Sequence, residues 1–199
     1  MLADRIVGQR VRGAGWSGAG LLAQFLLVLA GSAFLAASAR ISIPLPLTPV
    51  PITAQTLAVL LVGALYGARL GPLTVLAYLG EGLIGLPVFH GGTAGPAVLA
   101  GPTGGYLLGF VLAAFIVGWL LQGRRHATVI PTIVAFLIGD LALTAVGAMW
   151  VAHFVGYGSA WTAGVLPFIP GEAIKIALAT ASVTSGRRLF RSENKATPG

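Results

Sequence analysis

The chain has 199 residues, of which 56% are hydrophobic and 9% charged, and its mean hydropathy is +0.91. Soluble domains carry roughly 25% charged residues, so this composition excludes an ordinary soluble protein and indicates an integral membrane protein. The net charge of +7 does not indicate a nucleic-acid partner, because the basic residues are scattered at the ends of apolar segments and form no basic face. The absence of cysteine excludes disulfides and thiolate metal sites.

Apolar segments fill most of the sequence. A helix needs about 20 apolar residues to cross the hydrocarbon core of a membrane, and six segments come near this length. We therefore predict an all-α integral membrane protein with six transmembrane helices in one domain, residues 1–188, followed by a disordered cytoplasmic tail, residues 189–199. The predicted helices span residues 21–39, 53–67, 70–86, 104–122, 128–154 and 171–184.

The basic residues predict the orientation, because cytoplasmic loops of membrane proteins carry an excess of Lys and Arg. With a cytoplasmic N-terminus, ten of the 12 basic residues fall in cytoplasmic segments, Arg40 lies outside, and Lys175 lies within the last helix. Since the number of helices is even, both termini are expected in the cytoplasm. The ten cytoplasmic residues are Arg5, Arg10, Arg12, Arg69, Arg124, Arg125, Arg187, Arg188, Arg191 and Lys195.

The first apolar segment has a second interpretation. A basic leader precedes it, and residues 37–39, "ASA", resemble a signal-peptidase site, so cleavage is an alternative to a retained first helix. The apolar run is longer than that of a usual signal peptide, which favours retention. The distribution of charge fits both alternatives.

Four charged residues remain within or near the apolar segments: Glu81, Asp140, Glu172 and Lys175. A charge costs roughly 2.5 to 3.5 kcal/mol at the bilayer centre, so such residues usually face a cavity, a partner or a substrate. Glu172 falls in the outer first turn of the last helix, and Lys175 lies three residues deeper on the same face. The two form either a self-contained ion pair or a site for a small molecule that is polar at two places. For Glu81 and Asp140, a contact between helices and a role in binding both stay open.

Two long outer connections are expected to wall this site. Residues 40–53 contain four prolines, which favour an extended path and exclude a helix. Residues 85–106 alternate glycine, proline and apolar residues without an acid, lysine or arginine. Irregular backbone is tolerated at membrane depth only where it is buried in protein or lines a cavity. We therefore expect a pocket that opens to the outside.

Motifs for common enzyme chemistry are weak in this sequence. The run "GPTGGY" lacks the Gly-Lys-Ser/Thr of a phosphate-binding loop and no predicted strand precedes it. His90 and His153 have no third ligand at helical spacing, which does not support a zinc site, and His153 fits an interfacial position beside Trp150. The enzyme alternative is an intramembrane serine protease that would use Ser159 with His90 or His153 as its base.

Four stretches resemble the signature segments of one family. They are "LTPVPITAQTLAVLLVGALYG", "GLPVFHGG", "GPTGGYLLGF" and "PFIPGEAIK", and they occur in the order and spacing of the BioY family, across residues 20–185. Members of this family are the biotin-specific substrate-binding components, or S components, of energy-coupling factor (ECF) transporters. The resemblance implies the ECF S-component fold, with six helices, cytoplasmic termini, and an outer pocket between the two connections and the last three helices.

The resemblance also implies which residues bind biotin. Glu172 and Lys175 match the acid and the lysine of the family's "PGExxK" segment, although the family commonly has aspartate at the acidic position. Lys175 would take the biotin carboxylate and Glu172 a polar group such as a ureido N–H, or the two ends are reversed. The further substrate-binding candidates are Phe89, His90, Thr103, Tyr106, Thr53 and Gln55.

Each of these candidates also has a structural alternative. Tyr106 fits an interfacial aromatic belt and His90 a solvent-facing loop. Thr53 and Gln55 either hydrogen-bond the ligand or hold the first connection on the start of the second helix.

A stripe of small residues on the first helix includes Ala33 and Ala37, and such stripes permit close helix contact. The resemblance implies that it docks an ECF transmembrane coupling subunit, with internal packing as the alternative. Two ATPase subunits would then supply the energy. We expect a multi-pass protein of a prokaryotic cytoplasmic membrane that captures biotin and is not an enzyme, without a cofactor or metal. The alternative within transport is an S component for another carboxylate-bearing vitamin.

Overall fold

The computed structural model describes the backbone of residues 18–46, 48–122 and 128–196, and side chains of these ranges between residues 20 and 185. The elements in chain order are α3 (Gly18–Ala39), β1 (Ser42–Ile43), β2 (Ile52–Thr53), α4 (Gln55–Leu83), η1 (His90–Gly92), α5 (Pro96–Ala100), α6 (Gly104–Leu121), α7 (Val129–Val155), η2 (Tyr157–Ser159), α8 (Ala160–Gly164) and α9 (Ile169–Ala196).

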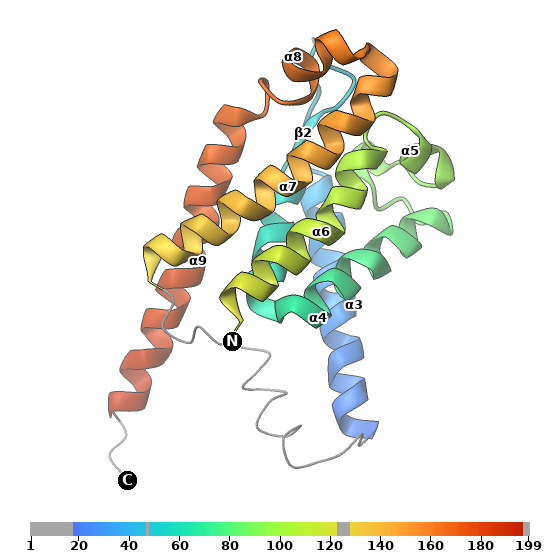
Figure 1. Ribbon diagram of the computed structural model, residues 1–199. Helices are drawn as coiled ribbons and strands as arrows, with labels where there is room; N and C mark the ends of the chain where they lie inside the picture. The colour runs from blue at the N-terminus through green and yellow to red at the C-terminus, as the bar shows by residue number, and fades with distance from the viewer. Residues whose placement is uncertain (1–17, 47, 123–127, 197–199) are drawn as a thin grey trace.

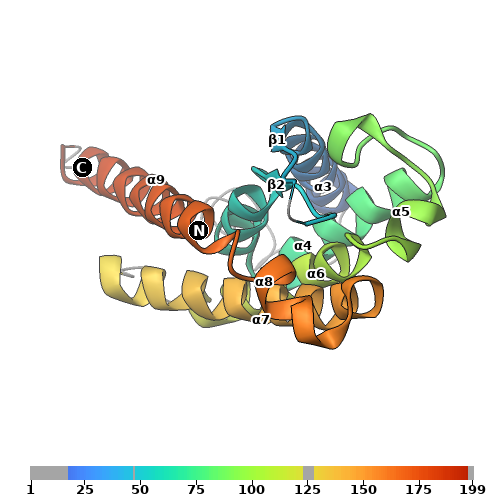
Figure 2. The ribbon, with the colours of Figure 1, turned by 90° about the horizontal axis from the view of Figure 1, so that it is seen from above.

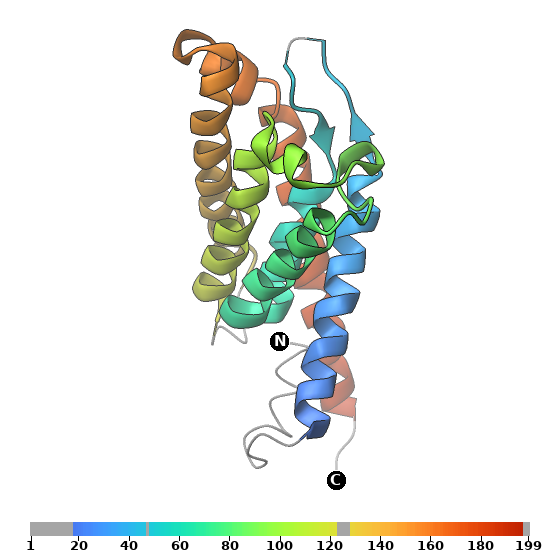
Figure 3. The same ribbon diagram turned by 90° about the vertical axis from the view of Figure 1, so that its right-hand side faces the viewer.

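The long helices run roughly along one axis (Figure 1). The start of α3 and the end of α9 lie at the same end of the molecule, and the β1–β2 hairpin, α5 and α8 gather at the other end (Figures 1 and 3). From above, these three segments stand around the upper ends of α4 and α6 (Figure 2). The short elements and loops that follow the long helices are therefore collected at one end, where they can wall a site.

Four helices of the described part, α3, α4, α6 and α7, are long and apolar enough to cross a membrane. The segments Tyr157–Gly164 and Ile169–Ser185, which bend by 46° at a short break, together make a possible fifth span. A mostly helical, multi-pass membrane protein is thus confirmed, with one short hairpin, β1–β2, that an all-α fold did not include. Length and composition alone count four or five spans here rather than six, because the predicted second and third helices both fall within α4.

A break at Gly67 explains this difference. Gly67 has φ 81° and ψ −177° inside α4, a conformation that glycine adopts without a Cβ clash. The chain reverses there, so that one arm of α4 descends and the other rises (Figures 1 and 3). The sequence predicted a separate turn at residues 68–69, but one glycine makes the reversal without a loop. At 1.5 Å per residue the two arms are about 18 and 24 Å long.

Close packing between α4 and α6 supports the break. A Cβ added at Gly118 of α6 would lie 2.4 Å from the carbonyl carbon of Gly67. The absence of a side chain at Gly118 therefore lets the backbones meet, as small residues do in membrane helix pairs. Around this contact the core of α4, α6 and α7 is filled by apolar side chains such as Leu60, Val117 and Phe136.

The helix α3 packs on α4 along one side only. Leu35 is fully buried in the core, and the buried hydroxyl of Ser32 donates a hydrogen bond to Glu81 of α4. The other faces of α3 expose large apolar side chains, as expected against lipid: Leu21, Leu22, Phe25, Leu26, Leu29 and Phe34. The contact between Ser32 and Glu81 is the helix–helix alternative that the sequence left open for Glu81.

The outer connections differ in their detail from the prediction. Residues 40–53 follow the predicted extended path, and β1 pairs antiparallel with β2, with Ser42 opposite Thr53. Residues 85–106 contain η1 and the short helix α5, which begins with proline at its first position, where a missing N–H costs nothing. The sequence did not predict these short helices, or η2 and α8.

The last helix is longer than predicted. The backbone of α9 is helical to Ala196, into the segment 189–199 that we expected to be disordered. Residues 186–196 include Arg, Leu, Glu, Lys and Ala, which are good helix formers, so they continue a helix that has already been nucleated. Residues 197–199 lie outside the described residues, as do the basic residues predicted at the N-terminus.

Candidate substrate-binding site

A pocket lies at the end of the molecule that carries the hairpin, α5 and α8. It holds about 520 Å³ of empty space, part of which is open to solvent. Its walls come from both outer connections and from α4, α6, α7 and α9, of which α4 is an addition to the walls that the resemblance implied. The lining residues are Val50, Pro51, Thr53, Gln55, Thr56, His90, Thr103, Tyr106, Leu107, Phe110, Leu143, Thr144, Phe168, Glu172 and Lys175.

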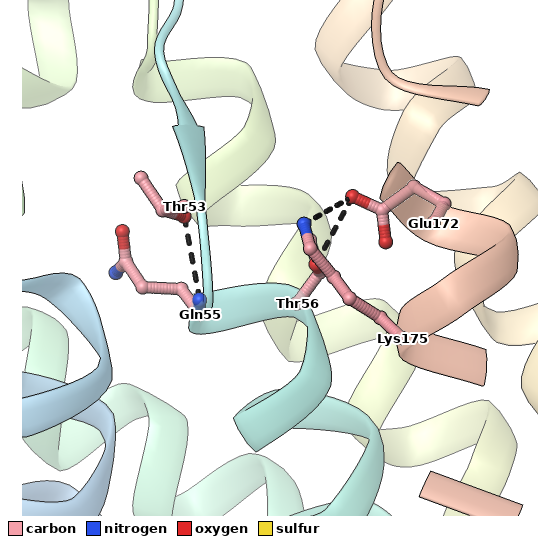
Figure 4. A network of polar contacts seen from close by, with 5 residues as sticks. All are labelled: Thr53, Gln55, Thr56, Glu172 and Lys175. Atoms are coloured by element: carbon pink, nitrogen blue, oxygen red, sulfur yellow. Dashed lines mark hydrogen bonds and ion pairs between the residues drawn. The ribbon is translucent and has the colours of Figure 1, made fainter. Parts of the chain in front are cut away.

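An ion pair forms the polar centre of this pocket. The Lys175 Nζ lies 2.7 Å from the Glu172 Oε1, and both side chains are about nine-tenths buried, with 11% and 10% exposed. Thr56 bridges the two: Lys175 donates to the Thr56 Oγ1 at 2.8 Å, and Thr56 donates to the Glu172 Oε1 at 3.1 Å (Figure 4). The spacing of one helical turn thus brings the acid and the lysine together, as the sequence predicted.

The start of α9 explains this placement. The helix begins at Ile169, so that Glu172 stands in its first turn, where a negative charge is favourable beside the free N–H groups. The Glu172 N–H donates to the carbonyl of Phe168 at 2.9 Å, which fixes the turn. Lys175 then lies one turn deeper and reaches back toward the same carboxylate.

The ion pair leaves one hydrogen-bond donor and one acceptor without a partner among the described residues. An ammonium group has three N–H donors, of which Lys175 uses two, for Glu172 and Thr56. The Oε2 of Glu172 is buried and has no hydrogen-bond partner among the described residues. An unpartnered buried carboxylate oxygen is unfavourable, so this site can gain from further donors and acceptors.

Thr56 is a site residue that sequence reasoning missed. It follows Gln55 directly in the segment "ITAQT", where the sequence offers several polar side chains at the start of a helix. Periodicity alone could not tell which of them faces α9, because the orientation of α4 depends on its packing. The only available signal was the extra hydroxyl one residue after a predicted site residue.

Thr53 and Gln55 both line the pocket, but they point away from the ion pair (Figure 4). The Thr53 Oγ1 accepts a hydrogen bond from the Gln55 N–H at 3.3 Å, which links β2 to the first residue of α4. The Gln55 Nε2 donates to the Tyr78 hydroxyl at 2.7 Å, and Tyr78 donates to the carbonyl of Val88 at 3.1 Å. This chain of hydrogen bonds ties the pocket to the second outer connection, so both of the predicted roles are compatible with the geometry.

Tyr106 lies in the first turn of α6 and also lines the pocket. Its hydroxyl donates to the carbonyl of Gly164 in α8, and its ring packs on Phe168 with the centroids 5.8 Å apart. Tyr106 thereby contacts both α8 and the short connection between α8 and α9. This environment places Tyr106 inside the protein and not in an interfacial belt.

His90 and Thr103 also line the pocket, and Phe89 does not. Burial lowers the pKa of His90, so at neutral pH it presents an uncharged imidazole. Phe89 is fully buried beneath the connection, against Tyr78 and Gly82, and a Cβ added at Gly82 would lie only 2.0 Å from its ring. Phe89 was predicted to line the site; the structure instead places it as the anchor of the connection, because Gly82 leaves room for an aromatic ring.

The two alanines on α3 are exposed. Ala33 and Ala37 lie one turn apart, on a face of α3 that is turned away from α4. The alternative that they pack within the protein is therefore wrong for these two positions.

Asp140 lies on α7, below the floor of the pocket, and is 8% exposed. Its Oδ1 has no hydrogen-bond partner among the described residues. The charges of Glu172 and Lys175 act on it, so it belongs to the surroundings of the ion pair although it does not line the pocket.

In the described part of the chain, no hydrogen bond joins the Ser159 hydroxyl to His90 or His153. The Nε2 of His153 faces the Tyr157 hydroxyl at 3.3 Å, and its Nδ1 faces the carbonyl of Met149 at 3.1 Å. Ser159 accepts a hydrogen bond from Thr162 through its backbone carbonyl. Within the part of the chain that the structure describes, no group of three or more His, Cys, Asp or Glu could hold a metal ion.

Comparisons with known proteins extend over most of this chain. The family model described as the BioY family matches residues 11–192. The biotin transporter BioY2 of Lactococcus lactis subsp. cremoris (strain MG1363) is 40% identical over 156 residues, which cover 77% of this chain and 84% of that protein. A probable biotin transporter BioY of Pyrococcus horikoshii is 42% identical over 131 residues, or 66% of this chain and 76% of that protein.

A solved structure has the same fold. It is the crystal structure of the S-component for biotin from an ECF-type ABC transporter, which matches with a TM-score of 0.71 and 28% identity over 89% of this chain and 95% of that one. With a family match over residues 11–192 and this agreement in fold, the chain belongs to the BioY family.

Proposed function

We propose that this protein binds biotin at the outer face of a prokaryotic cytoplasmic membrane and delivers it for uptake as the substrate-specific component of an ECF-type transporter. The observation that carries the proposal is the pocket around Lys175, Glu172 and Thr56. Within its apolar walls, this pocket offers a hydrogen-bond donor and an acceptor to a ligand. Relatives named as biotin transporters and the biotin S-component structure support the choice of ligand.

The geometry of the ion pair favours one end of biotin. Lys175 and Glu172 are in contact, so a single polar group of the ligand must meet both. A ureido ring has a carbonyl beside N–H groups, so its carbonyl can accept from Lys175 while an N–H donates to Glu172. A carboxylate has acceptors only and would be repelled by the adjacent Glu172. We therefore assign the ureido end to the ion pair, which is the reverse of the first assignment made from the sequence.

The apolar walls fit the rest of the ligand. Leu107, Phe110, Leu143 and Phe168 line the pocket and offer contact for a fused ring and an aliphatic chain. Thr103 and the uncharged His90 lie among the lining residues that come from the second connection. They are the proposed polar contacts for the parts of the ligand that extend away from the ion pair.

The same proposal includes the membrane topology. With each arm of α4 counted as a crossing, and the bent segment of α8 and α9 as the last, the chain crosses the membrane six times and both termini lie in the cytoplasm. Arms of about 18 and 24 Å are shorter than the hydrocarbon core of about 30 Å, and spans of such lengths are accommodated by local thinning of the bilayer. The distribution of basic residues supports this orientation.

Partners complete the proposal. The exposed stripe of small residues that includes Ala33 and Ala37 is proposed to dock the coupling subunit. Two ATPase subunits are proposed to drive import. Biotin is the transported substrate and not a cofactor.

Calorimetry on the detergent-purified protein tests the choice of ligand. Biotin and desthiobiotin, which share the ureido group, are expected to bind, with a constant near 1 nM corresponding to about −12 kcal/mol for biotin. Riboflavin, which has no carboxylate tail and a larger ring, is expected to give no heat. Riboflavin binding without biotin binding would instead support an S component for another vitamin, and the absence of heat with all three would contradict the proposal.

A further inference from the structure

Two acidic side chains from different helices meet below the pocket. Asp140 of α7 and Glu172 of α9 are each 8% exposed by residue, and they lie close enough to share a side-chain hydrogen bond. The packing of α7 against α9 places Asp140 and Glu172 at a similar height along the two helices. Phe136, one turn before Asp140, packs in the same core cluster as Ile176, and Thr144, one turn after it, lines the pocket with Glu172.

The hydrogen bonding of these two carboxyl groups is incomplete. The Oδ1 of Asp140 and the Oε2 of Glu172 are both buried, and neither has a donor among the described residues. Ionised carboxylates are acceptors only, so two of them in contact cannot satisfy each other. A single proton between them converts one into a donor and satisfies both.

The balance of charge around Asp140 and Glu172 also requires one proton on this pair of carboxyl groups. Among the described side chains, the charged groups that act on Asp140 are Glu172 and Lys175 of α9. One ammonium group can neutralise one carboxylate, and it is already paired with Glu172 at 2.7 Å. A second buried carboxylate without a counter-charge is strongly unfavourable, and a group in that position takes up a proton.

Among the side chains that the structure describes, the other elements packed against α7 supply no counter-charge to Asp140. The titratable groups of α6 and η2 are the phenols of Tyr106 and Tyr157, whose hydroxyls bond to Gly164 and His153. In α4, Glu81 is bound to Ser32 and Tyr78 to Gln55 and Val88, while Tyr66 and Arg69 do not act on Asp140. The described part of α8 has no titratable side chain.

We propose that Asp140 is a proton-binding positioning residue, whose carboxyl group donates a hydrogen bond to the Oε2 of Glu172 and thereby holds the other oxygen against Lys175 and Thr56. A carboxylate has about four acceptor positions, so Asp140, Thr56, Lys175 and a ligand N–H can all be served by Glu172. Loss of the proton places a second anion beside Lys175 and draws the ammonium away from the geometry that the ligand needs. Substrate binding is therefore lost as the pH rises.

The inference rests on the proposed function for its probe ligand, but its first test needs no ligand. Infrared spectra of the full chain in lipid are expected to contain the C=O stretch of a protonated carboxyl group at neutral pH, which disappears as the pH is raised and is absent from Asp140→Asn at neutral and alkaline pH. A band that persists at neutral pH in Asp140→Asn, or no protonated carboxyl band at neutral pH in the wild type, would overturn the proposal.

Calorimetry with biotin supplies the second test. Above the pH at which the proton leaves, the wild-type affinity is expected to fall about tenfold per pH unit, because one proton is linked to binding. Asp140→Asn retains an N–H donor and is expected to bind without this dependence. Asp140→Leu has no donor and leaves Glu172 unsatisfied, so it is expected to bind at least about tenfold more weakly than Asp140→Asn. Equal affinities of the two variants, or a pH dependence retained in Asp140→Asn, would reject the role.

Two controls test other causes of a loss of binding at high pH. His90→Gln is expected to show the same loss at alkaline pH as the wild type, since the imidazole is already uncharged there; a loss that His90→Gln abolishes would assign the effect to His90. If added Na⁺ restores binding at high pH, the acid pair is a cation site and the proposal fails. Biotin that fails to bind at any pH contradicts the proposed function, whereas biotin that binds equally at all pH values contradicts only the role of Asp140.

Discussion

At the scale of residues, the site is defined by which of its hydrogen-bond donors and acceptors have partners within the protein. Lys175 gives two of its donors to Glu172 and Thr56, so its third donor is available to a ligand. A self-contained ion pair would use the side chains on each other alone. The threonine bridge and the unpartnered Oε2 of Glu172 instead leave a site that a ligand with both a donor and an acceptor can complete.

Substitution of the lysine tests which end of biotin it meets. Lys175→Met keeps the apolar stem but removes the ammonium, and we expect a loss of about 2 kcal/mol or more, roughly 30-fold in Kd. Because the ureido group is the assigned partner, biotin and biotin amide should lose affinity equally. Titration calorimetry measures both, with the wild type and each ligand as the reference. A loss for biotin that spares biotin amide would instead assign the carboxylate to Lys175.

The sequence predicted the acid and the lysine at the polar centre of this pocket but not their contacts. Glu172 and Lys175 stand out because charges are rare in an apolar chain, and helical spacing fixes their common face. Thr56 did not stand out, because a threonine is common at the start of a helix and only the packing of α4 on α9 turns it toward the ion pair. Phe89 was misplaced because an apolar loop residue fits a pocket wall and a buried anchor equally well, and the choice depends on the space above Gly82.

At the scale of elements, the reversal within α4 depends on a backbone contact. Gly67 turns the chain and Gly118 of α6 packs against it with no side chain between them. The Gln55–Tyr78–Val88 hydrogen bonds then link the first arm, the second arm and the outer connection. The two arms are thus held at one end by close packing and at the other by a polar chain.

Gly118→Ala tests the packing at the break. The added methyl group would lie 2.4 Å from the backbone of Gly67 and cannot be accommodated without a backbone shift, so a destabilisation of about 1 to 3 kcal/mol is expected. Gly80→Ala is the matched control, because a Cβ at Gly80 has no neighbour within 4 Å and alanine favours a helix. Thermal unfolding in detergent should lower the Tm of the first variant only. Equal Tm values for both would contradict the close approach of the helices.

The exposed face of α3 has its own test. Ala33→Trp adds a large side chain to the small stripe and is expected to prevent co-purification with the coupling subunit, while biotin binding by the isolated protein is retained because α3 does not line the pocket. Phe34→Trp, at a neighbouring exposed position, is the control and should assemble normally. Intact assembly of Ala33→Trp would show that the coupling subunit docks elsewhere.

At the scale of the whole molecule, the outer connections and short helices collect at one end and the described ends of α3 and α9 at the other (Figure 1). The pocket therefore opens on one side of the proposed membrane, and the acid and the lysine lie among its lining residues. This asymmetry is what capture from one face requires, because the site is reached through the loops and closed on the other side by packed helices.

The absence of cysteine allows a direct test of the topology. Ser159→Cys in η2 is expected to react with a membrane-impermeant maleimide in intact cells, and Thr128→Cys before α7 only after the membrane is opened. Both positions are exposed in the structure, so accessibility reports the side of the membrane. Labelling of Thr128→Cys in intact cells would reverse the proposed orientation.

The sequence by itself determined the membrane class, the positions of most helices, the family resemblance and the pair Glu172 and Lys175. These features depend on local composition and spacing, since apolar length and helical periodicity are properties of a segment. Only the tertiary structure decided that one glycine reverses α4, that Thr56 bridges the ion pair, that Phe89 is an anchor and that Asp140 meets Glu172. Each of these depends on which faces of distant segments come into contact, and that is set by packing across the whole chain rather than by any single stretch of it.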